Sequence, residues 1–219
     1  MKILIADDHG VLRDGLRTMI EEDLGYSAVA EAGSGNEAVR LTEQLSPDLV
    51  IMDILMPGIN GIEATHMIAE RCRKTKVIIL TMDSSRINIR KSLEAGAKGY
   101  LLKEDFFQEI KSAIEAVQRG ERYYSKSVRT SAEAAEQELR VNKALNSGFD
   151  KLTPREKQIC LLLARKYTRK GIAEELSVSP RTVDNIRESI KQKLSLKDRS
   201  ELNIFVEQVA KMISPQLEQ

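Results

Sequence analysis

Three aspartates each come directly after a short apolar run, and their carboxylates are the first side chains of the sequence that could do chemistry. Asp7 and Asp8 follow the run at 3–6, and Asp53 follows the run at 49–52. Thr81 comes directly after the run at 77–80, and Lys103 after the run at 99–102. If these runs are strands of one parallel sheet, ligands bind beyond their carboxyl ends. We therefore expect all five side chains at one edge of the sheet.

A hard divalent cation such as Mg²⁺ would explain why carboxylates gather there, because unneutralised carboxylates repel one another. Beside that cation, the hydroxyl of Thr81 and the ammonium of Lys103 would clamp three phosphoryl oxygens, with Asp53 as the nucleophile. The pattern thus predicts a phospho-acceptor site. Each residue alone has a plainer interpretation as a solvated loop, a cap or a surface residue, and His9 is interpreted as a loop residue. Five residues at the ends of four different strands are hard to obtain by chance.

The sequence that positions this cluster alternates between short apolar runs and longer amphipathic stretches. Such alternation predicts a doubly wound parallel sheet, (βα)5 and flavodoxin-like, with helices on both faces. After about residue 123 the strand pattern stops, and four helical segments follow residue 151. The expected fold class is α/β and then all-α, with domains at 1–121 and 151–219 and a partly helical linker at 122–150. The five expected strands lie at 3–6, 27–31, 49–52, 77–80 and 99–102.

The composition excludes several classes of protein. Of 219 residues, 42% are hydrophobic and 31% charged, and no apolar run approaches the roughly 18 to 20 residues that span a bilayer. The N-terminal MKILIADDHG places carboxylates where a secretory signal needs apolar residues, so we expect a cytoplasmic protein without membrane association. Cys72 and Cys160 lie far apart and outside zinc-ligand spacing, which favours reduced thiols over a disulfide or a zinc site.

The charge is unevenly divided between the two halves. Residues 1–150 contain 20 Lys and Arg against 24 Asp and Glu, whereas residues 151–219 contain 14 against 9. The net charges are therefore −4 and +5. A mildly basic second half suggests a polyanion as partner, although ordinary solvated surfaces show differences of this size too.

The second half carries the pattern of a helix-turn-helix. Val183, Ile186, Ile190 and Leu194 recur at helical spacing and form one apolar stripe, and a short helix and a tight turn precede them. The second helix of such a motif enters the major groove of DNA, while a simple helical interaction domain is the plainer alternative. The residues predicted to face DNA are Arg181, Thr182, Asp184, Asn185, Arg187, Glu188 and Lys191.

The chemistry of these side chains assigns them different tasks. Asn185 suits adenine, whereas Arg187 and Lys191 suit phosphates. Asp184 and Glu188 would weaken attraction to phosphates, unless they accept hydrogen bonds from cytosine N4 or pair with basic residues of the same helix.

Residues 1 to about 120 resemble the receiver domain of two-component response regulators, through ADDH at 6–9, MDILMPGINGIEA at 52–64, LTM at 80–82 and AGAKGYLLKE at 95–104. The resemblance implies that a sensor histidine kinase phosphorylates Asp53. It implies that Asp8 and Asp53 bind Mg²⁺, that Asp7 assists through water, and that the carbonyl of Leu55 completes the protein ligands.

The same resemblance assigns Thr81 and Lys103 to the phosphoryl group and makes Tyr100 an aromatic switch that rotates. An ordinary half-buried strand residue is the alternative for Tyr100. Gly58 and Gly61 would shape the loop beyond the acceptor, where glycine tolerates positive φ.

Two positions near the acceptor are expected to set the lifetime of the phosphoryl group. Many members of the resembled family carry a polar side chain two residues after the acceptor, where this chain has Leu55, which cannot orient a hydrolytic water. We therefore predict slow self-dephosphorylation. Asp83, two residues after Thr81, could still guide water and offset this effect.

The segment 152–202 resembles the LuxR-type helix-turn-helix of the NarL/FixJ family, with LTPRE at 152–156 and TV at 182–183. It departs from the family pattern at Gly171, Asp184, Ile186 and Glu188. The two resemblances imply a response regulator, not an enzyme, that binds double-stranded DNA as a homodimer favoured by phosphorylation and regulates transcription. One alternative is a phosphatase-type enzyme, whose DxD acceptor spacing is missing. The other is a regulator that binds a protein instead of DNA, motivated by the two carboxylates of the predicted DNA-reading helix.

Overall fold

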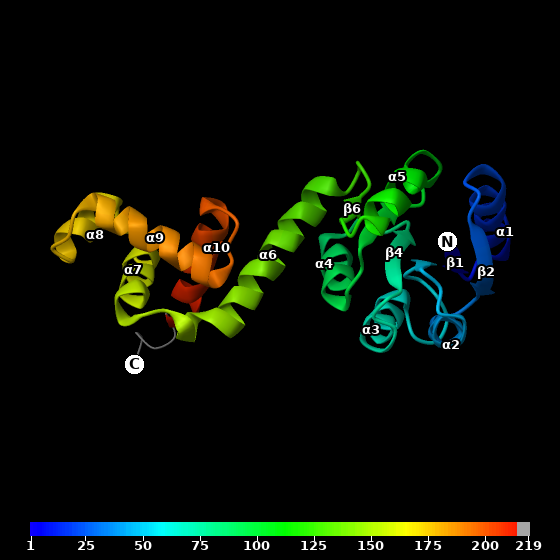
Figure 1. The fold of residues 1–219 in the computed structure, drawn as a ribbon, viewed down its shortest axis with the longest axis horizontal. Helices are drawn as coiled ribbons and strands as arrows, with labels where there is room; N and C mark the ends of the chain where they lie inside the picture. The colour runs from blue at the N-terminus through cyan, green and yellow to red at the C-terminus, as the bar shows by residue number, and fades with distance from the viewer. Residues whose placement is uncertain (214–219) are drawn as a thin grey trace. The chain divides into compact units, whose positions relative to one another are not determined.

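The computed structural model describes residues 1–213, except for the side chains of Ser147 and of residues 211–213. The chain divides into two compact units, Met1–Ala135 and Glu136–Gln219. The last part of the predicted second domain, residues 214–219, lies outside the described residues. Figure 1 shows a sheet with helices in the first unit and helices alone in the second.

The first unit is a parallel α/β fold, which confirms the predicted fold class. Among the described residues its sheet has six strands in the order β2-β1-β3-β4-β5-β6, and every pair is parallel. The strand order reverses beside β1, which creates the switch point where such sheets bind ligands. Its elements are β1 (Lys2–Ala6), α1 (Gly10–Thr18), the π-helical turn η1 (Met19–Asp23), β2 (Ser27–Ala32), α2 (Gly35–Leu45), β3 (Leu49–Met52), α3 (Gly61–Arg71), β4 (Lys76–Thr81), α4 (Arg86–Ala95), β5 (Gly99–Leu102), α5 (Phe106–Gln118) and β6 (Tyr123–Tyr124).

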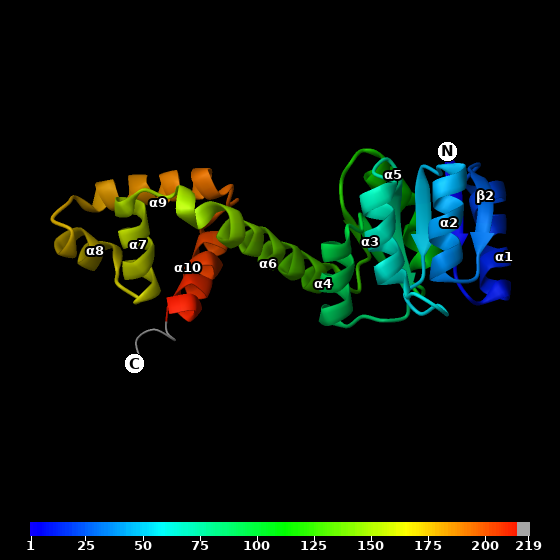
Figure 2. The same cartoon turned by 90° about the horizontal axis from the view of Figure 1, so that it is seen from below.

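Helices cover both faces of this sheet, as its apolar strands require. All residues of β3 and β5 are buried, which is typical of parallel strands covered on both sides. Helices α1 and α5 pack on one face, where Leu16 and Ile110 join strand residues such as Ile51 in one core. Helices α2 and α3 cover the other face, in front of the sheet in Figure 2.

The sixth strand was not predicted, because two residues are too short for a strand pattern to appear in the sequence. Tyr123 and Tyr124 pair in parallel with Gly99 and Tyr100 of β5. The backbone N–H of Ser125 then donates to the carbonyl of Tyr100 at 3.0 Å. Tyr123 and Tyr124, within the segment predicted as a linker, therefore extend the sheet by one short strand.

The second unit is entirely helical within residues 136–213. Helix α6 (Arg129–Gly148) begins in the first unit and ends in the second, where Val141 and Ala144 are buried in the helical core. Side-chain oxygens at the N-caps begin the next helices, with Thr153 and Ser179 each followed by a proline at the first helical position. The remaining elements are the 3₁₀ turn η2 (Phe149–Lys151), α7 (Pro154–Ala164), α8 (Arg169–Glu175), α9 (Pro180–Leu194) and α10 (Arg199–Ile213).

The core of this unit gathers apolar side chains from every one of its long helices. Ile159 of α7, Ile190 of α9 and Phe205 of α10 are fully buried in it. The rings of Phe149 and Phe205 lie 6.2 Å apart between centroids. Arg140 of α6 also pairs with the buried carboxylate of Glu201 on α10 at 2.7 Å. The end of α6 is thus part of this helical core.

Across the part of the chain that the structure describes, no helix has both the length and the apolar character needed to cross a membrane.

Candidate functional site

The acidic cluster forms because β1 and β3 are neighbours with matched ends. Ala6 lies opposite Met52, so the residues that follow, Asp7 and Asp53, leave the sheet side by side. The backbone N–H of Asp53 donates to the carbonyl of Ala6 at 2.8 Å, which extends the pairing by one residue. Both carboxylates are almost fully buried, with exposed fractions of 1% for Asp7 and 4% for Asp53. Two negative charges therefore share a poorly hydrated space.

Lys103 supplies the positive charge between them. Its Nζ lies 2.6 Å from Oδ2 of Asp7 and 2.7 Å from Oδ2 of Asp53. The second oxygen of Asp53 accepts a hydrogen bond from the backbone N–H of Ile54 at 2.7 Å. Burial raises the pKa of the Asp53 carboxyl, and the charge of Asp7 adds to this, so that the net shift is upward although Lys103 acts in the opposite direction. Burial lowers the pKa of Lys103, but the two carboxylates outweigh it and raise that pKa overall.

Asp8 and His9 complete the cluster on its exposed side. Nδ1 of His9 lies 2.8 Å from the Asp8 carboxylate and 3.2 Å from that of Asp7. Ligand atoms of Asp7, Asp8, His9 and Asp53 all lie within 4.8 Å of one another. Three carboxylates so close together form an oxygen donor set that fits a hard divalent cation. His9, interpreted from the sequence as a loop residue, is part of this cluster, and its place directly after the acidic pair is the signal that could have revealed it.

Thr81 and Tyr100 converge on the backbone of Asp83. Both side chains are fully buried. The Thr81 hydroxyl accepts a hydrogen bond from the N–H of Asp83 at 3.3 Å, and the Tyr100 hydroxyl donates to the carbonyl of Asp83 at 2.6 Å. Burial, reinforced by the charges of Asp83 and Asp53, raises the pKa of Tyr100, so its hydroxyl is a donor at neutral pH. The two residues are thus connected through the start of the loop that follows β4.

The loop beyond Asp53 depends on two glycines for different reasons. Gly58 has a φ of +80°, a conformation that favours glycine. Gly61 does not have positive φ, contrary to our expectation; instead, a Cβ there would collide with the carbonyl oxygen of Asp53. Because glycine has no Cβ, α3 can begin directly against the backbone of Asp53. The side chain of Leu55, in the same loop, is 68% exposed.

Helix α9 presents the residues predicted to face DNA. Arg181, Asn185 and Glu188 are exposed, whereas Thr182, Asp184, Arg187 and Lys191 are partly exposed. Thr182 is at the beginning of the helix, where its N–H donates to the Ser179 hydroxyl at 3.0 Å. Burial, together with the nearby charges of Arg199 and Arg169, lowers the pKa of Arg187.

The two carboxylates of α9 are both paired with cations. Glu188 lies 2.7 Å from Lys191 on the same helix, as one of the sequence alternatives required. Asp184 instead pairs at 2.8 Å with Arg169, the first residue of α8, a partner that sequence spacing does not reveal. Both anions are thus compensated on the protein itself, which reduces their repulsion toward a polyanion.

A buried carboxylate also holds α7 against α9. Glu156 is 5% exposed and completes a capping box with Thr153. It accepts hydrogen bonds at 2.8 Å from both the Ser189 hydroxyl and Lys193 Nζ. Burial alone would raise the pKa of Glu156, but these donors lower it to about 2.

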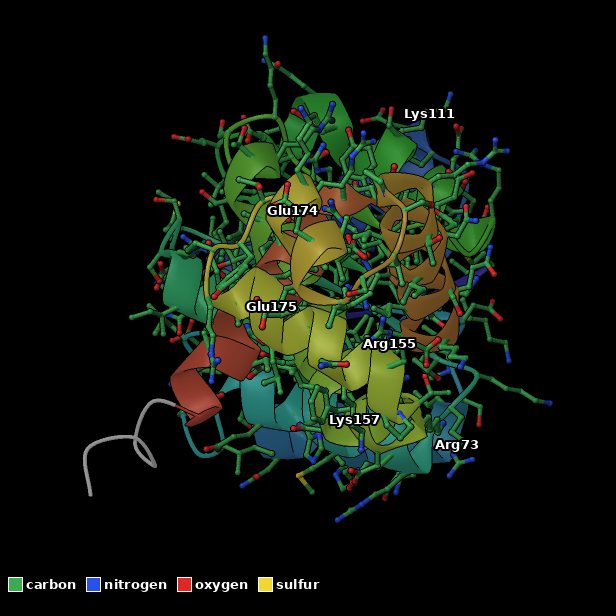
Figure 3. All side chains as sticks on the ribbon, turned by 90° about the vertical axis from the view of Figure 1, so that its left-hand side faces the viewer. Arg73, Lys111, Arg155, Lys157, Glu174 and Glu175 are labelled. Carbon is green, nitrogen blue, oxygen red and sulfur yellow. The ribbon has the colours of Figure 1, made fainter. Side chains whose placement is uncertain are left out.

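An arginine of α7 caps the C-terminal end of α8. Arg155 donates to the carbonyl of Leu176, just past the last helical residue, at 2.8 Å. Figure 3 shows the labelled side chains of Arg155 on α7 and of Glu174 and Glu175 on α8. A cation at this position satisfies a carbonyl at the negative end of the helix. Arg155 therefore fixes the end of α8 to α7, and Glu156 fixes the second half of α9 to α7 through Ser189 and Lys193.

Each of the two units matches a known protein family. The profile of the response regulator receiver domain matches residues 3–115, and that of the luxR family of bacterial regulatory proteins matches residues 150–206. Response regulator UvrY of Escherichia coli is 36% identical over 202 residues, covering 92% of this chain and 91% of UvrY. The transcriptional regulatory protein LiaR of Bacillus subtilis is 35% identical over 205 residues, covering 94% of this chain and 96% of LiaR.

Solved structures show the same fold. A two-component response regulator of the LuxR family from an Aurantimonas species is 38% identical, with a TM-score of 0.58, and the match covers 62% of this chain and 96% of that one. RcsB from Salmonella enterica serovar Typhimurium, solved bound to a promoter with the phosphomimetic BeF₃⁻, is 23% identical. Its TM-score is 0.55, with 95% of this chain and 99% of that chain covered.

The first unit is therefore a receiver domain, and the second contains a LuxR-type helix-turn-helix. The chain belongs to the two-component response regulators of the NarL/FixJ family, which are regulators with a DNA-binding domain and not metabolic enzymes.

Proposed function

We propose that Asp53 accepts a phosphoryl group from a sensor histidine kinase, and that this phosphorylation controls dimerisation and DNA binding. The observation that carries the proposal is the buried Asp53 carboxylate, 2.7 Å from Lys103 Nζ and within 4.8 Å of the other acidic ligand atoms. In the transfer, an Asp53 oxygen attacks phosphorus, the bond from phosphorus to the kinase imidazole nitrogen breaks, and the imidazole leaves with the electron pair. Asp53 thereby becomes an acyl phosphate.

The proposed ligands of Mg²⁺ are the carboxylates of Asp7, Asp8 and Asp53 and the carbonyl of Leu55. When bound, the cation neutralises charge on the phosphoryl oxygens during transfer. The carboxylates of Asp7 and Asp8 lie close to that of Asp53, and the single positive charge of Lys103 does not balance all three. Lys103 contributes a fixed positive charge to the transferred group.

Thr81 and Tyr100 would transmit the change. A phosphoryl group adds about −1.5 to −2 charges at Asp53 and brings new hydrogen-bond acceptors. If the Thr81 hydroxyl turns to donate to that group, it releases the N–H of Asp83, whose carbonyl holds Tyr100. Tyr100 is thus the switch residue that senses this rearrangement, and α4, which begins three residues after Asp83, carries it to the surface.

The DNA contacts would come from α9, with Asn185 for bases and Arg181, Arg187 and Lys191 for phosphates. Thr182, Asp184 and Glu188 lie on the same helix and would tune specificity. One related RcsB structure is described as two dimers bound to two parallel DNAs, and we propose that this chain also binds as a phosphorylation-favoured homodimer. Because its DNA partner is in the cytoplasm, the protein would act there.

Selection from a random DNA pool tests this function. The full-length protein, with Mg²⁺ and with or without beryllofluoride at fixed salt, is mixed with random-sequence duplexes, and the bound fraction is sequenced. We expect a paired half-site motif that is enriched with beryllofluoride alone and is not enriched by Asp53→Asn, which lacks the acceptor carboxylate. Asn185→Ala should relax the motif at one position, whereas Arg187→Ala should reduce the salt dependence of binding.

A control substitution in the receiver, Arg73→Ala, removes an exposed arginine far from α9 in sequence and should leave the motif and the affinity unchanged. Absence of any motif in both states would overturn the DNA function. It would favour the alternative of a phosphorylation-controlled regulator that binds a protein.

A further inference from the structure

Arg13 of α1 contacts the backbone of the acidic cluster. Its Nη1 donates to the carbonyl oxygen of Asp7 at 2.6 Å. Its Nε donates to Glu31 at the end of β2, 3.2 Å away. The side chain is 21% exposed, so it lies largely within the protein. A charged donor with a short bond in a partly buried place makes a strong hydrogen bond.

The guanidinium is seated between the loops that follow β1 and β2. A Cβ added to Gly10 or Gly33 would lie 3.8 Å from its Nη2 and Nη1 respectively, so both glycines lie beside it. Glu31 also pairs with Arg17, one turn further along α1, at 3.2 Å. Glu31 is therefore an anchor that two arginines share, and only Arg13 of the two reaches Asp7.

The carbonyl that Arg13 binds belongs to the peptide that joins Asp7 to Asp8. The N–H of Asp7 already donates to the carbonyl of Ala32 at 3.0 Å. With the carbonyl fixed by Arg13, both ends of Asp7 are held, and the direction of the following residue is fixed as well. We propose that Arg13, anchored by Glu31, is a positioning residue that keeps the Asp7 and Asp8 carboxylates turned toward Asp53 for Mg²⁺ binding.

The sign of one measurement separates positioning from simple electrostatics. A cation beside a metal site repels a second cation, so removal of Arg13 should strengthen Mg²⁺ binding if charge alone mattered. If Arg13 positions the ligands, its removal should weaken binding, because residues that orient metal ligands typically change affinity by about tenfold or more. The inference rests on the proposed Mg²⁺ site, and the two can fail separately.

The experiment measures Mg²⁺ affinity of the full-length protein by calorimetric titration. We expect Arg13→Gln to weaken Mg²⁺ binding by about tenfold. Glu31→Gln should weaken it less, because Arg13 keeps its bond to Asp7. Arg17→Gln is the matched control, since it removes a cation that shares Glu31 but does not contact Asp7, and its Mg²⁺ affinity should equal or slightly exceed that of the unmodified protein.

Each result decides between the two proposals. Mg²⁺ affinity that is unchanged or stronger in Arg13→Gln overturns the positioning role. No Mg²⁺ binding by the unmodified protein overturns the metal site itself and leaves Arg13 as a structural contact. Thermal unfolding with and without Mg²⁺ shows that each variant folds, and Arg13→Lys, which retains the charge but cannot bind Asp7 and Glu31 together, replaces Arg13→Gln if that variant does not fold.

Discussion

Each of the two units contains a buried carboxylate beside a lysine, yet the two centres differ in how completely the charge is compensated. Around Asp53, one ammonium serves two buried carboxylates, with a third close by. Around Glu156, one carboxylate receives a lysine, a serine hydroxyl and the backbone N–H of Thr153. The first centre has too few donors for its negative charges, and the second has enough.

The pKa values follow this difference in opposite directions. Burial raises the pKa of Asp53 despite Lys103, whereas the donors around Glu156 lower its pKa to about 2 although burial acts against them. A buried carboxylate beside a lysine therefore belongs to the proposed phospho-acceptor site in one unit and to a structural contact in the other. What distinguishes them is the number of charges and donors that share the buried space.

The largest effect is expected at Glu156, which holds α7 against α9. Glu156→Gln should reduce the free energy of unfolding of the helical unit by about 2 to 3 kcal/mol, because it removes the buried charge that accepts hydrogen bonds from Lys193, Ser189 and the N–H of Thr153. Hydrogen exchange of α7 and α9 peptides in increasing urea measures this locally. Glu174→Gln, an exposed position on α8, is the control and should change stability by less than about 0.5 kcal/mol. Equal losses of unfolding free energy in both variants would show that Glu156 stabilises the unit no more than an exposed residue does.

The stabilisation that Glu156 provides should decrease in acid over a defined pH interval. The ordinary pKa of 4.5 applies to unfolded Glu156 and about 2 to the folded state, so its contribution is complete above pH 4.5 and is lost as the pH falls toward 2. The difference in stability between the unmodified protein and Glu156→Gln should therefore shrink by about 1 kcal/mol between pH 4.5 and 3.5. A difference that is constant over this interval would contradict the lowered pKa.

Mg²⁺ should act on one centre alone. At a concentration about 100 times its dissociation constant, a ligand stabilises the state that binds it by about 2.7 kcal/mol. We expect that stabilisation in peptides of β1, β3 and β5, and none in α7 or α9, because Glu156 belongs to no group of possible metal ligands among the described residues. NaCl at the same ionic strength controls for general effects of salt, because Na⁺ binds carboxylates far more weakly than a divalent cation does. Equal protection of both units would remove the distinction between the centres.

The fold was predictable to the extent that it depends on hydrophobic period. The apolar runs at 3–6, 49–52 and 99–102 are buried on both faces, and a pattern of consecutive apolar residues predicts such strands. Strand β6 was not predicted because it consists of only Tyr123 and Tyr124, followed by a hydrogen bond from Ser125. Two residues leave no periodic pattern in the sequence. The π-helical turn after α1 likewise has no distinct pattern in the sequence.

The site was predictable where its residues directly follow strands, since strand order then places them together. Asp7, Asp53 and Lys103 meet as expected. Contacts that depend on side-chain direction were not predictable: Arg13 bends back to Asp7, and Arg169 reaches Asp184 from another helix. Nothing in spacing along the sequence specifies these directions. The close approach at Gly61 was found for the wrong reason, because the sequence suggests positive φ and the structure shows contact with Asp53.

A smaller effect concerns how long a phosphoryl group would remain on Asp53. Leu55 offers no polar atom to a water, and the carboxylate of Asp83 is already occupied by the N–H of Ser85 at 2.6 Å and the amide of Asn88 at 2.5 Å. Leu55→Asn should therefore accelerate dephosphorylation by about tenfold, equivalent to about 1.4 kcal/mol of barrier. Loss of radiolabel after acetyl phosphate treatment measures the rate. Asp83→Ala should change the rate little; a large decrease would show that Asp83 guides the water.

The smallest effect should have the opposite sign to that at Glu156. Asp53→Asn removes one of two carboxylates that share Lys103, and the remaining Asp7 still pairs with it at 2.6 Å. Since the folded state raises the pKa of Asp53, its ionised form opposes folding, and this cost grows as the pH rises through the folded pKa. We expect the substitution to stabilise the receiver by on the order of 1 kcal/mol at neutral pH, as happens where function requires a strained site. Hydrogen exchange of β3 and β5 peptides without Mg²⁺ measures it, and the gain should diminish in acid. Destabilisation at neutral pH would mean that Lys103 fully compensates Asp53, and the two centres would then differ in chemistry but not in charge balance.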